Sequence, residues 1–394
     1  MGMREPAVSD VQTQAPAEPQ RTSYRTIRPS SPFIALKKRH GKLRANGLMF
    51  LQARTPYFRR SIVDKLDSII SKALSRRTFL AGAGAVAATT TITGCSNNNV
   101  TATTSGYTDA DILNYALNLE YLEAEFYLRA ATGSGLQASD TTAGSASPYQ
   151  TVGSVTVGYA AQVPVTGSSP SNQQQILNEI AYEEQEHVRF LRAALGSAAV
   201  PRPAIDLSFF GPLAVAAGIY TSAQPAFNPF ASFDAFLIGA FIFEDVGVTA
   251  YSGAAPLISA AGVASGYLTA AAGILAVEAY HAGYIRTSIT GRGITNSSNT
   301  YIAIANQVAA LRASLTVGNS AAPSTTGSVE TNLLLPTTTS TPSAIVAASS
   351  SNAVGFARTV NQVHHIVYGS PTVGVAKGGF FPSGTNSIFA TTTA

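Results

Sequence analysis

Two stretches of this 394-residue sequence match each other: EEQEHVRFLR at residues 183–192 and VEAYHAGYIR at residues 277–286. When they are aligned, both contain Glu, then His three residues later, an aromatic residue six later and Arg eight later. Residues three apart lie on one face of an α-helix, so each stretch can direct a carboxylate and an imidazole the same way. The match predicts two helices that present the same pair of groups.

A second pair of stretches alternates with the first. LEYLEAEFY at residues 119–127 and FEDVGVTAY at residues 243–251 each place a Tyr seven residues after a Glu. The order along the chain is therefore single Glu, Glu-x-x-His, single Glu, Glu-x-x-His. This order indicates an internal repeat of two helix pairs.

Apolar residues recur at helical spacing around all four stretches. The predicted helices run from Thr108 or Asp109 to about residue 131, from Ser171 or Asn172 to about residue 195, and over about residues 233–253 and 266–290. Five prolines exclude one continuous helix over residues 198–231, which we interpret as a long crossover. Further helical pattern covers about residues 301–315 and 354–368. The prediction is an all-α four-helix bundle with one long crossover and additional C-terminal helices.

Six residues on the predicted inner faces can bind metal. Buried unpaired carboxylates are strongly unfavourable, so four inward glutamates need cations to neutralise them. One Glu from each of two helices and Glu-x-x-His from each of the others is the pattern of dinuclear carboxylate proteins. Hard oxygen ligands with imidazole and no thiolate favour iron or manganese over structural zinc. The predicted ligands of two iron ions, or alternatively two manganese ions, are Glu120, Glu184, His187, Glu244, Glu278 and His281.

Neighbouring polar residues leave alternatives open. Glu123 is a ligand if the helix is rotated from its predicted register, and Glu183 is a candidate for contact with a ligand. Tyr127 and Tyr251, the candidate catalytic residues, either hydrogen-bond ligand carboxylates or are plain core tyrosines. The remaining charged residues are predicted to reach solvent: Glu125, Glu186, Asp245, Arg192 and Arg286.

The N-terminal region differs in composition from the rest. Residues 1–94 contain 16 Lys and Arg against 5 Asp and Glu, whereas residues 95–394 contain 9 against 16. The basic charge therefore belongs to the leader and does not indicate nucleic-acid binding. Arg76 and Arg77, a short apolar run and Cys95, the only cysteine, resemble a twin-arginine signal with a lipoprotein cleavage site.

The signal predicts an exported protein of the periplasm or cell envelope, with a lipid anchor at Cys95, starting at Met1 or Met49. We expect a leader at residues 1–94, a tether at 95–106, the bundle at 107–316, and a loop, closing helix and tail at 317–394. The chain after Cys95 contains no run of 18 apolar residues, so we expect no membrane-spanning helix there.

The ligand motifs resemble those of the ferritin-like superfamily, which includes rubrerythrin and bacterioferritin. Within it, the chain is most similar to exported ferritin-like proteins related to plant desiccation-related protein, and residues 358–368 and 378–382 resemble that family's closing helix and tail. The resemblance implies that Glu120 and Glu244 are terminal or bridging ligands, and that each Glu-x-x-His supplies a pair. The long leader, first connection and Pro-rich crossover depart from the family pattern and argue against a ferritin-type cage.

Two functions are compatible with these residues and motifs. The first is redox chemistry with O2 or peroxide, in which the two metals oxidise Fe(II) or remove peroxide; the sequence leaves ferroxidase, peroxidase and manganese-catalase-like reactions open. The second is a non-enzymatic desiccation or stress protein of the envelope, in which the metal stabilises the bundle.

Overall fold

The computed structural model describes residues 106–165, 171–221, 226–295, 300–316, 330–334, 345–349 and 353–393. All of them belong to one compact unit of the chain. The predictions for the leader, for Arg76 and Arg77, and for Cys95 concern residues outside this set. None of the described helices combines the length and the apolar character needed to span a membrane.

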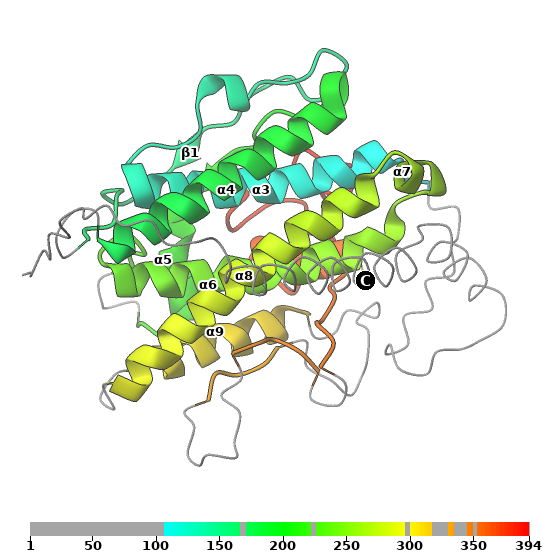
Figure 1. Cartoon of the computed structure of the whole chain (residues 1–394). Helices are drawn as coiled ribbons and strands as arrows, with labels where there is room; N and C mark the ends of the chain where they lie inside the picture. Colours follow the sequence, from blue (N-terminus) through cyan, green and yellow to red (C-terminus); the bar gives the residue numbers. More distant parts are fainter. Residues whose placement is uncertain are drawn as a thin grey trace, which may run out of the picture. The chain divides into compact units, whose positions relative to one another are not determined.

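Four long helices dominate the described chain (Figure 1). They are α3 (Asp109–Thr132), α4 (Asn172–Leu195), α6 (Phe233–Ala254) and α8 (Tyr267–Thr295). Shorter helices are α5 (Phe210–Ala216), α7 (Ala260–Ala264), α9 (Tyr301–Thr316) and α10 (Val360–Val367). Single 3-10 turns are η1 (Ala138–Asp140), η2 (Gly196–Ala198), η3 (Leu207–Phe209) and η4 (Ala255–Leu257). The prediction of an all-α bundle of four long helices with additional C-terminal helices is confirmed.

Side-chain caps explain where three of the long helices begin. Thr108 and Asp111 form a reciprocal capping box at the start of α3, and Ser171 and Ser232 cap α4 and α6 by accepting backbone N–H bonds. Such caps satisfy N–H groups that have no partner inside the helix. Gly133 ends α3 in the left-handed conformation that glycine adopts without a steric penalty.

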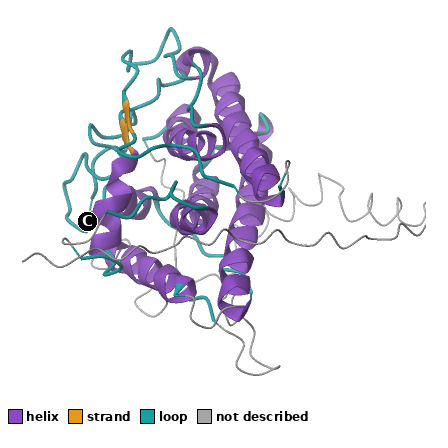
Figure 2. Ribbon diagram, turned by 90° about the vertical axis from the view of Figure 1, so that its left-hand side faces the viewer, coloured by secondary structure: helices purple, strands orange, loops and turns teal. Residues whose placement is uncertain are grey.

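The long helices pack as two pairs. α3 lies along α4, and α6 lies along α8, with α9 beside α8 and α6 (Figure 1). Two-residue strands β1 (Val155–Thr156) and β2 (Ile205–Asp206) pair in parallel and join the two long connections. They lie on the side of the bundle that loops cover (Figure 2). The strands thus tie the first connection to the crossover.

The C-terminal tail contributes to the same core as the bundle. Phe380 is buried and packs its ring against Phe210 and Phe243, with ring centroids 5.0 Å apart in each pair. Burial of aromatic rings is a major source of core stability. The C-terminal tail is therefore part of the hydrophobic core of the bundle.

The predicted helix over residues 354–368 is wrong in its first part, because the helix begins only at Val360. The Arg358 backbone N–H donates to the Thr249 carbonyl of α6 at 2.9 Å, which holds this segment against the bundle in a non-helical conformation. Gly253 permits the close approach, since a Cβ there would clash with the Arg358 carbonyl. Thr359 and Gln362 then form a capping box that starts α10.

Candidate metal centre

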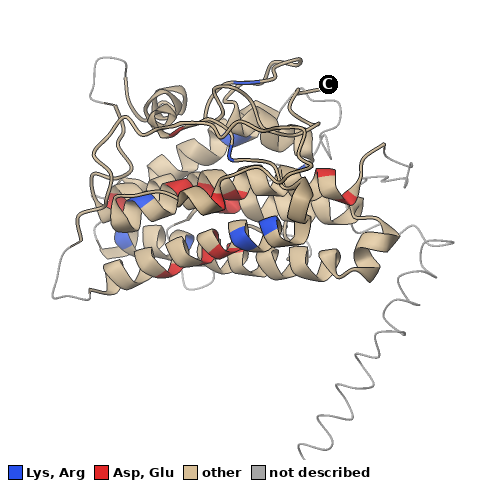
Figure 3. Ribbon diagram, turned by 90° about the horizontal axis from the view of Figure 1, so that it is seen from above, with Lys and Arg blue, Asp and Glu red and all other residues tan. Residues whose placement is uncertain are grey.

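The four long helices bring all six predicted ligands together at mid-length of the bundle, where acidic positions gather (Figure 3). The six are buried: Glu120 on α3, Glu184 and His187 on α4, Glu244 on α6, and Glu278 and His281 on α8. Their side chains form two groups, and within each group one potential ligand atom per residue lies within 4.8 Å of the others. The two groups share Glu184.

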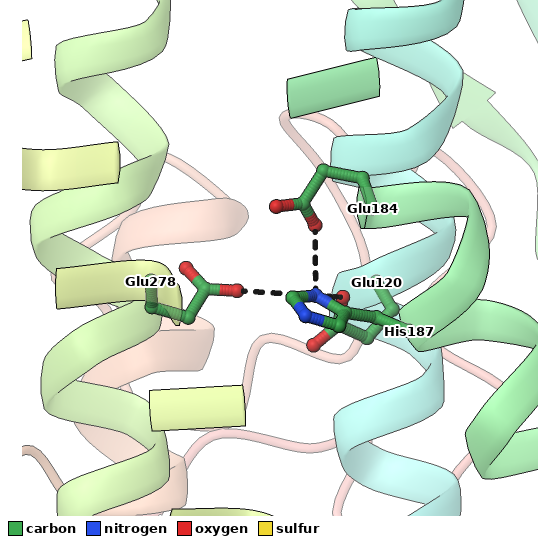
Figure 4. A group of neighbouring side chains, drawn as sticks. All are labelled: Glu120, Glu184, His187 and Glu278. Atoms are coloured by element: carbon green, nitrogen blue, oxygen red, sulfur yellow. Dashed lines mark hydrogen bonds and ion pairs between the residues drawn. The ribbon is translucent and has the colours of Figure 1, made fainter. Parts of the chain in front are cut away.

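The first group surrounds His187 (Figure 4). Its Nδ1 lies 3.2 Å from Glu120 Oε2, 3.4 Å from Glu184 Oε2 and 3.8 Å from Glu278 Oε1. Three carboxylates and one imidazole from three helices thus converge on a single point.

The second group surrounds His281. Its Nδ1 lies 3.1 Å from Glu184 Oε1 and 3.4 Å from Glu244 Oε2. Glu184 therefore turns one oxygen to each group, which is the arrangement required of a carboxylate that bridges two ions.

Glu278 belongs to the first group and not to the group of His281, although the two residues share a helix. The sequence predicts that this Glu-x-x-His pair directs both side chains the same way, whereas the structure divides the pair between the two groups. Gly247 of α6 explains the space for this carboxylate, because a Cβ at that position would clash with Glu278 Oε2.

The two candidate catalytic tyrosines form a reciprocal pair of hydrogen bonds across the bundle. The Tyr127 hydroxyl on α3 donates to Glu244 Oε1 on α6, and the Tyr251 hydroxyl on α6 donates to Glu120 Oε1 on α3. In both cases the other oxygen, Oε2, faces an imidazole. Each tyrosine therefore orients one carboxylate through Oε1 and leaves the Oε2 of that carboxylate free to bind a metal ion.

Several inner polar atoms make no hydrogen bond of suitable geometry. They are both carboxylate oxygens of Glu184 and of Glu278, Glu244 Oε2, and His281 Nδ1. Buried polar groups normally have partners, so a set of orphaned atoms that face one another points to a cation. Carboxylate and imidazole donors fit iron or manganese, and the six residues present therefore fit a pair of such ions.

Without cations, protons must balance the buried charge. Burial raises the pKa of Glu120, Glu244 and Glu278, and neighbouring carboxylates raise that of Glu278 further. Burial also favours protonation of Glu184, but the two imidazoles outweigh this effect and lower its pKa to about 2.

Burial alone would lower the pKa of both histidines. Glu120 and Glu184 overcome that effect and raise the pKa of His187 to about 11, while Glu244 and its neighbours raise that of His281 well above its ordinary value. Without metal, both imidazoles are therefore expected to be protonated at neutral pH.

Two further acids lie next to the ligands. Glu183 Oε2 lies 2.6 Å from His281 Nε2, so the other ring nitrogen is directed inward, as is common for metal-bound histidines. Glu123 is buried and adjoins Glu278, since both would contact a Cβ placed on Gly247. It belongs to neither candidate group.

Three charged residues that were predicted to reach solvent are instead buried, and these predictions are wrong. Glu125 is fully buried between Arg129 and Arg202. Asp245 and Arg286 form a buried ion pair of 2.8 Å. Helical periodicity missed them because Arg202 lies far from Glu125 in sequence and Arg286 lies on another helix than Asp245, although Arg129 follows Glu125 by four residues. A charged residue can enter a core once it is paired.

The pair of Asp245 and Arg286 belongs to a larger buried network. Asp245 also contacts Arg312 of α9 at 3.0 Å, and Glu330 joins Arg312 to Arg358. This network connects α6, α8 and α9 to the C-terminal segments directly beside Glu244. The sequence shows only isolated charges here and contains no spacing that would have revealed it.

Comparisons with known proteins agree with this architecture. A family model described as "Ferritin-like domain" matches residues 108–291. The chain is 28% identical over 309 residues to the ferritin-like catalase Nec2 of Nesocodon mauritianus, an alignment that covers 74% of this chain and 88% of that protein. It is 31% identical over 185 residues to desiccation-related protein PCC13-62 of Craterostigma plantagineum, covering 47% of this chain and 54% of that protein. No solved structure matches the chain significantly.

Proposed function

Because residues 108–291 form a ferritin-like domain, we propose that the chain binds two iron or two manganese ions and uses them to convert hydrogen peroxide to water and O2. The observation that supports this most directly is the pair of buried groups that share Glu184, with inner oxygens that make no hydrogen bond. The name of the catalase relative, which the chain matches over 88% of its length, favours peroxide as the substrate.

The reaction consumes two molecules of peroxide and yields two of water and one of O2. When bound, the two ions would supply the reversible two-electron redox chemistry that this reaction needs. Glu120, His187 and Glu278 would hold one ion, Glu244 and His281 the other, and Glu184 would bridge them. Glu183 keeps the His281 ring oriented, and Tyr127 and Tyr251 hold the carboxylates of Glu244 and Glu120 in place.

Whether the protein releases or consumes O2 distinguishes a catalase reaction from a ferroxidase reaction. A catalase releases O2 from peroxide, whereas a ferroxidase consumes O2 when Fe(II) is added. We expect purified protein with about two ions per chain to release O2 from peroxide. His187→Ala with His281→Ala should abolish both metal content and O2 release. Glu186→Gln, which alters a partly exposed acid on the same helix, should leave both unchanged.

A non-enzymatic role is the second candidate, favoured by the match to the desiccation-related protein. In that role the ions only stabilise the bundle. Fully loaded protein that neither releases nor consumes O2, yet melts well above the metal-free form, would support it and refute the catalase proposal.

We further propose that the protein is exported through the twin-arginine route and anchored to lipid at Cys95, on the basis of Arg76, Arg77 and the apolar run before Cys95. Replacing both arginines by Lys should retain the precursor in the cytoplasm, and Cys95→Ser should release the protein into the soluble periplasmic fraction. Normal fractionation of the Arg variant to the envelope would contradict the export proposal.

A further inference from the structure

A cavity of about 270 Å³ lies between α4 and α8 beside the candidate metal centre. A water molecule takes roughly 30 Å³ in the liquid, so the cavity has room for several. Its walls include Ile180, Glu179 and Glu183 from α4, and Val277, Tyr280 and His281 from α8. We call it the α4–α8 cavity.

The α4–α8 cavity leads from solvent to a candidate ligand. At its outer side, the Tyr280 side chain is largely exposed, and Glu179 is exposed as well. At its inner end lies His281, which is only 5% exposed. Glu183 lies between solvent and the buried His281, since its side chain is 34% exposed while its Oε2 contacts His281 Nε2.

The acids of this cavity break the internal repeat of the sequence. Alignment of the two Glu-x-x-His stretches places Gly273 opposite Glu179, and Val277 opposite Glu183. The ligands themselves obey the repeat. The negative charge of the cavity therefore comes from α4 alone and is not a by-product of the duplication that accounts for the ligands.

We propose that the α4–α8 cavity is the route by which divalent iron or manganese ions enter the centre, drawn in by Glu179 and passed by Glu183 to the His281 side. This inference rests on the proposed dinuclear centre. Carboxylates in a cleft with low-dielectric walls raise the local concentration and the association rate of cations. They have no comparable effect on neutral peroxide, so the charge of the wall favours the metal as the species that enters.

The rate of metal uptake tests this route separately from activity. Chelator-treated protein is mixed in a stopped-flow instrument with Mn(II), or with Fe(II) under anaerobic conditions, and uptake is followed with a metal indicator. Val277→Phe narrows the cavity at a partly exposed position and should slow uptake about tenfold or more. Ala279→Phe is the matched control, because it adds the same side chain to an exposed position of α8 that does not line the cavity.

Charge is tested with a second pair of variants. Glu179→Gln should slow uptake several-fold at low ionic strength, and the difference should shrink at high salt because screening weakens steering. Glu186→Gln, on the same helix but outside the cavity, should take up metal at the wild-type rate. All four variants should reach two ions per chain at equilibrium.

The outcomes separate the two proposals. If wild-type protein binds no metal, the proposed centre fails and this inference fails with it. If all variants reach two ions per chain and Val277→Phe and Glu179→Gln load as fast as their controls, the centre stands and the entry route is refuted.

Discussion

Removal of metal should make the stability of this protein strongly dependent on pH. In the metal-free centre, His187 and His281 lie among carboxylates that raise both of their pKa values, that of His187 to about 11. In the unfolded chain a histidine has a pKa near 6.5. Between about pH 7.5 and 10 the folded metal-free protein therefore holds two protons that the unfolded chain has lost.

Because the folded state binds more protons in this range, its stability must fall as pH rises. One extra proton corresponds to about 1.4 kcal/mol per pH unit, so two histidines give at most about 3 kcal/mol per unit. The raised pKa of Glu278 and that of Glu123 act in the same direction. A loss of about 5 kcal/mol over two pH units would be comparable to the total stability of many domains.

Metal-loaded protein should show a much shallower dependence, since ions replace the protons at the imidazoles. The assay is urea unfolding of chelator-treated and metal-loaded protein at pH 7, 8 and 9. Chelator-treated His187→Gln with His281→Gln is the control, and it should lose most of the pH dependence. Stability of the wild-type metal-free protein that is constant or rises from pH 7 to 9 would refute this account of the charged centre.

Three further predictions concern single contacts. Glu183→Gln should weaken metal affinity about 10- to 100-fold, the usual effect of removing a group that orients a ligand. A competition titration with a chelator measures this affinity, and an unchanged value would contradict the role of the contact between Glu183 and His281. Tyr127→Phe with Tyr251→Phe should retain two ions per chain but lower O2 release from peroxide, because Glu244 and Glu120 lose their fixed orientation. Full activity would remove both tyrosines from the mechanism. Asp245→Ala should destabilise the protein by about 3–5 kcal/mol, since it removes a buried carboxylate that pairs with both Arg286 and Arg312. A urea midpoint equal to that of wild type would show that this carboxylate adds nothing to stability.

Local sequence patterns are enough to predict the long helices and the six residues that gather at the centre. Both follow from local rules: apolar residues repeat with the period of the helix, and Glu-x-x-His places two ligands on one face. Capping residues such as Thr108 and Ser171 marked where helices begin, because their side chains bond the first free N–H groups of the same segment. These signals are contained within a few turns of one helix.

Which of these residues meet depends on how the helices pack against one another. Only packing of α3 against α6 pairs Tyr127 with Glu244 and Tyr251 with Glu120, and only the space at Gly247 allows Glu278 to join the group of His187. The burial of Asp245 likewise depends on arginines from α8 and α9, which lie 41 and 67 residues away in sequence. A helical pattern shows on which face of its helix a side chain lies. The residue that this side chain contacts depends on the positions of the other helices, which are set by the packing of the folded core.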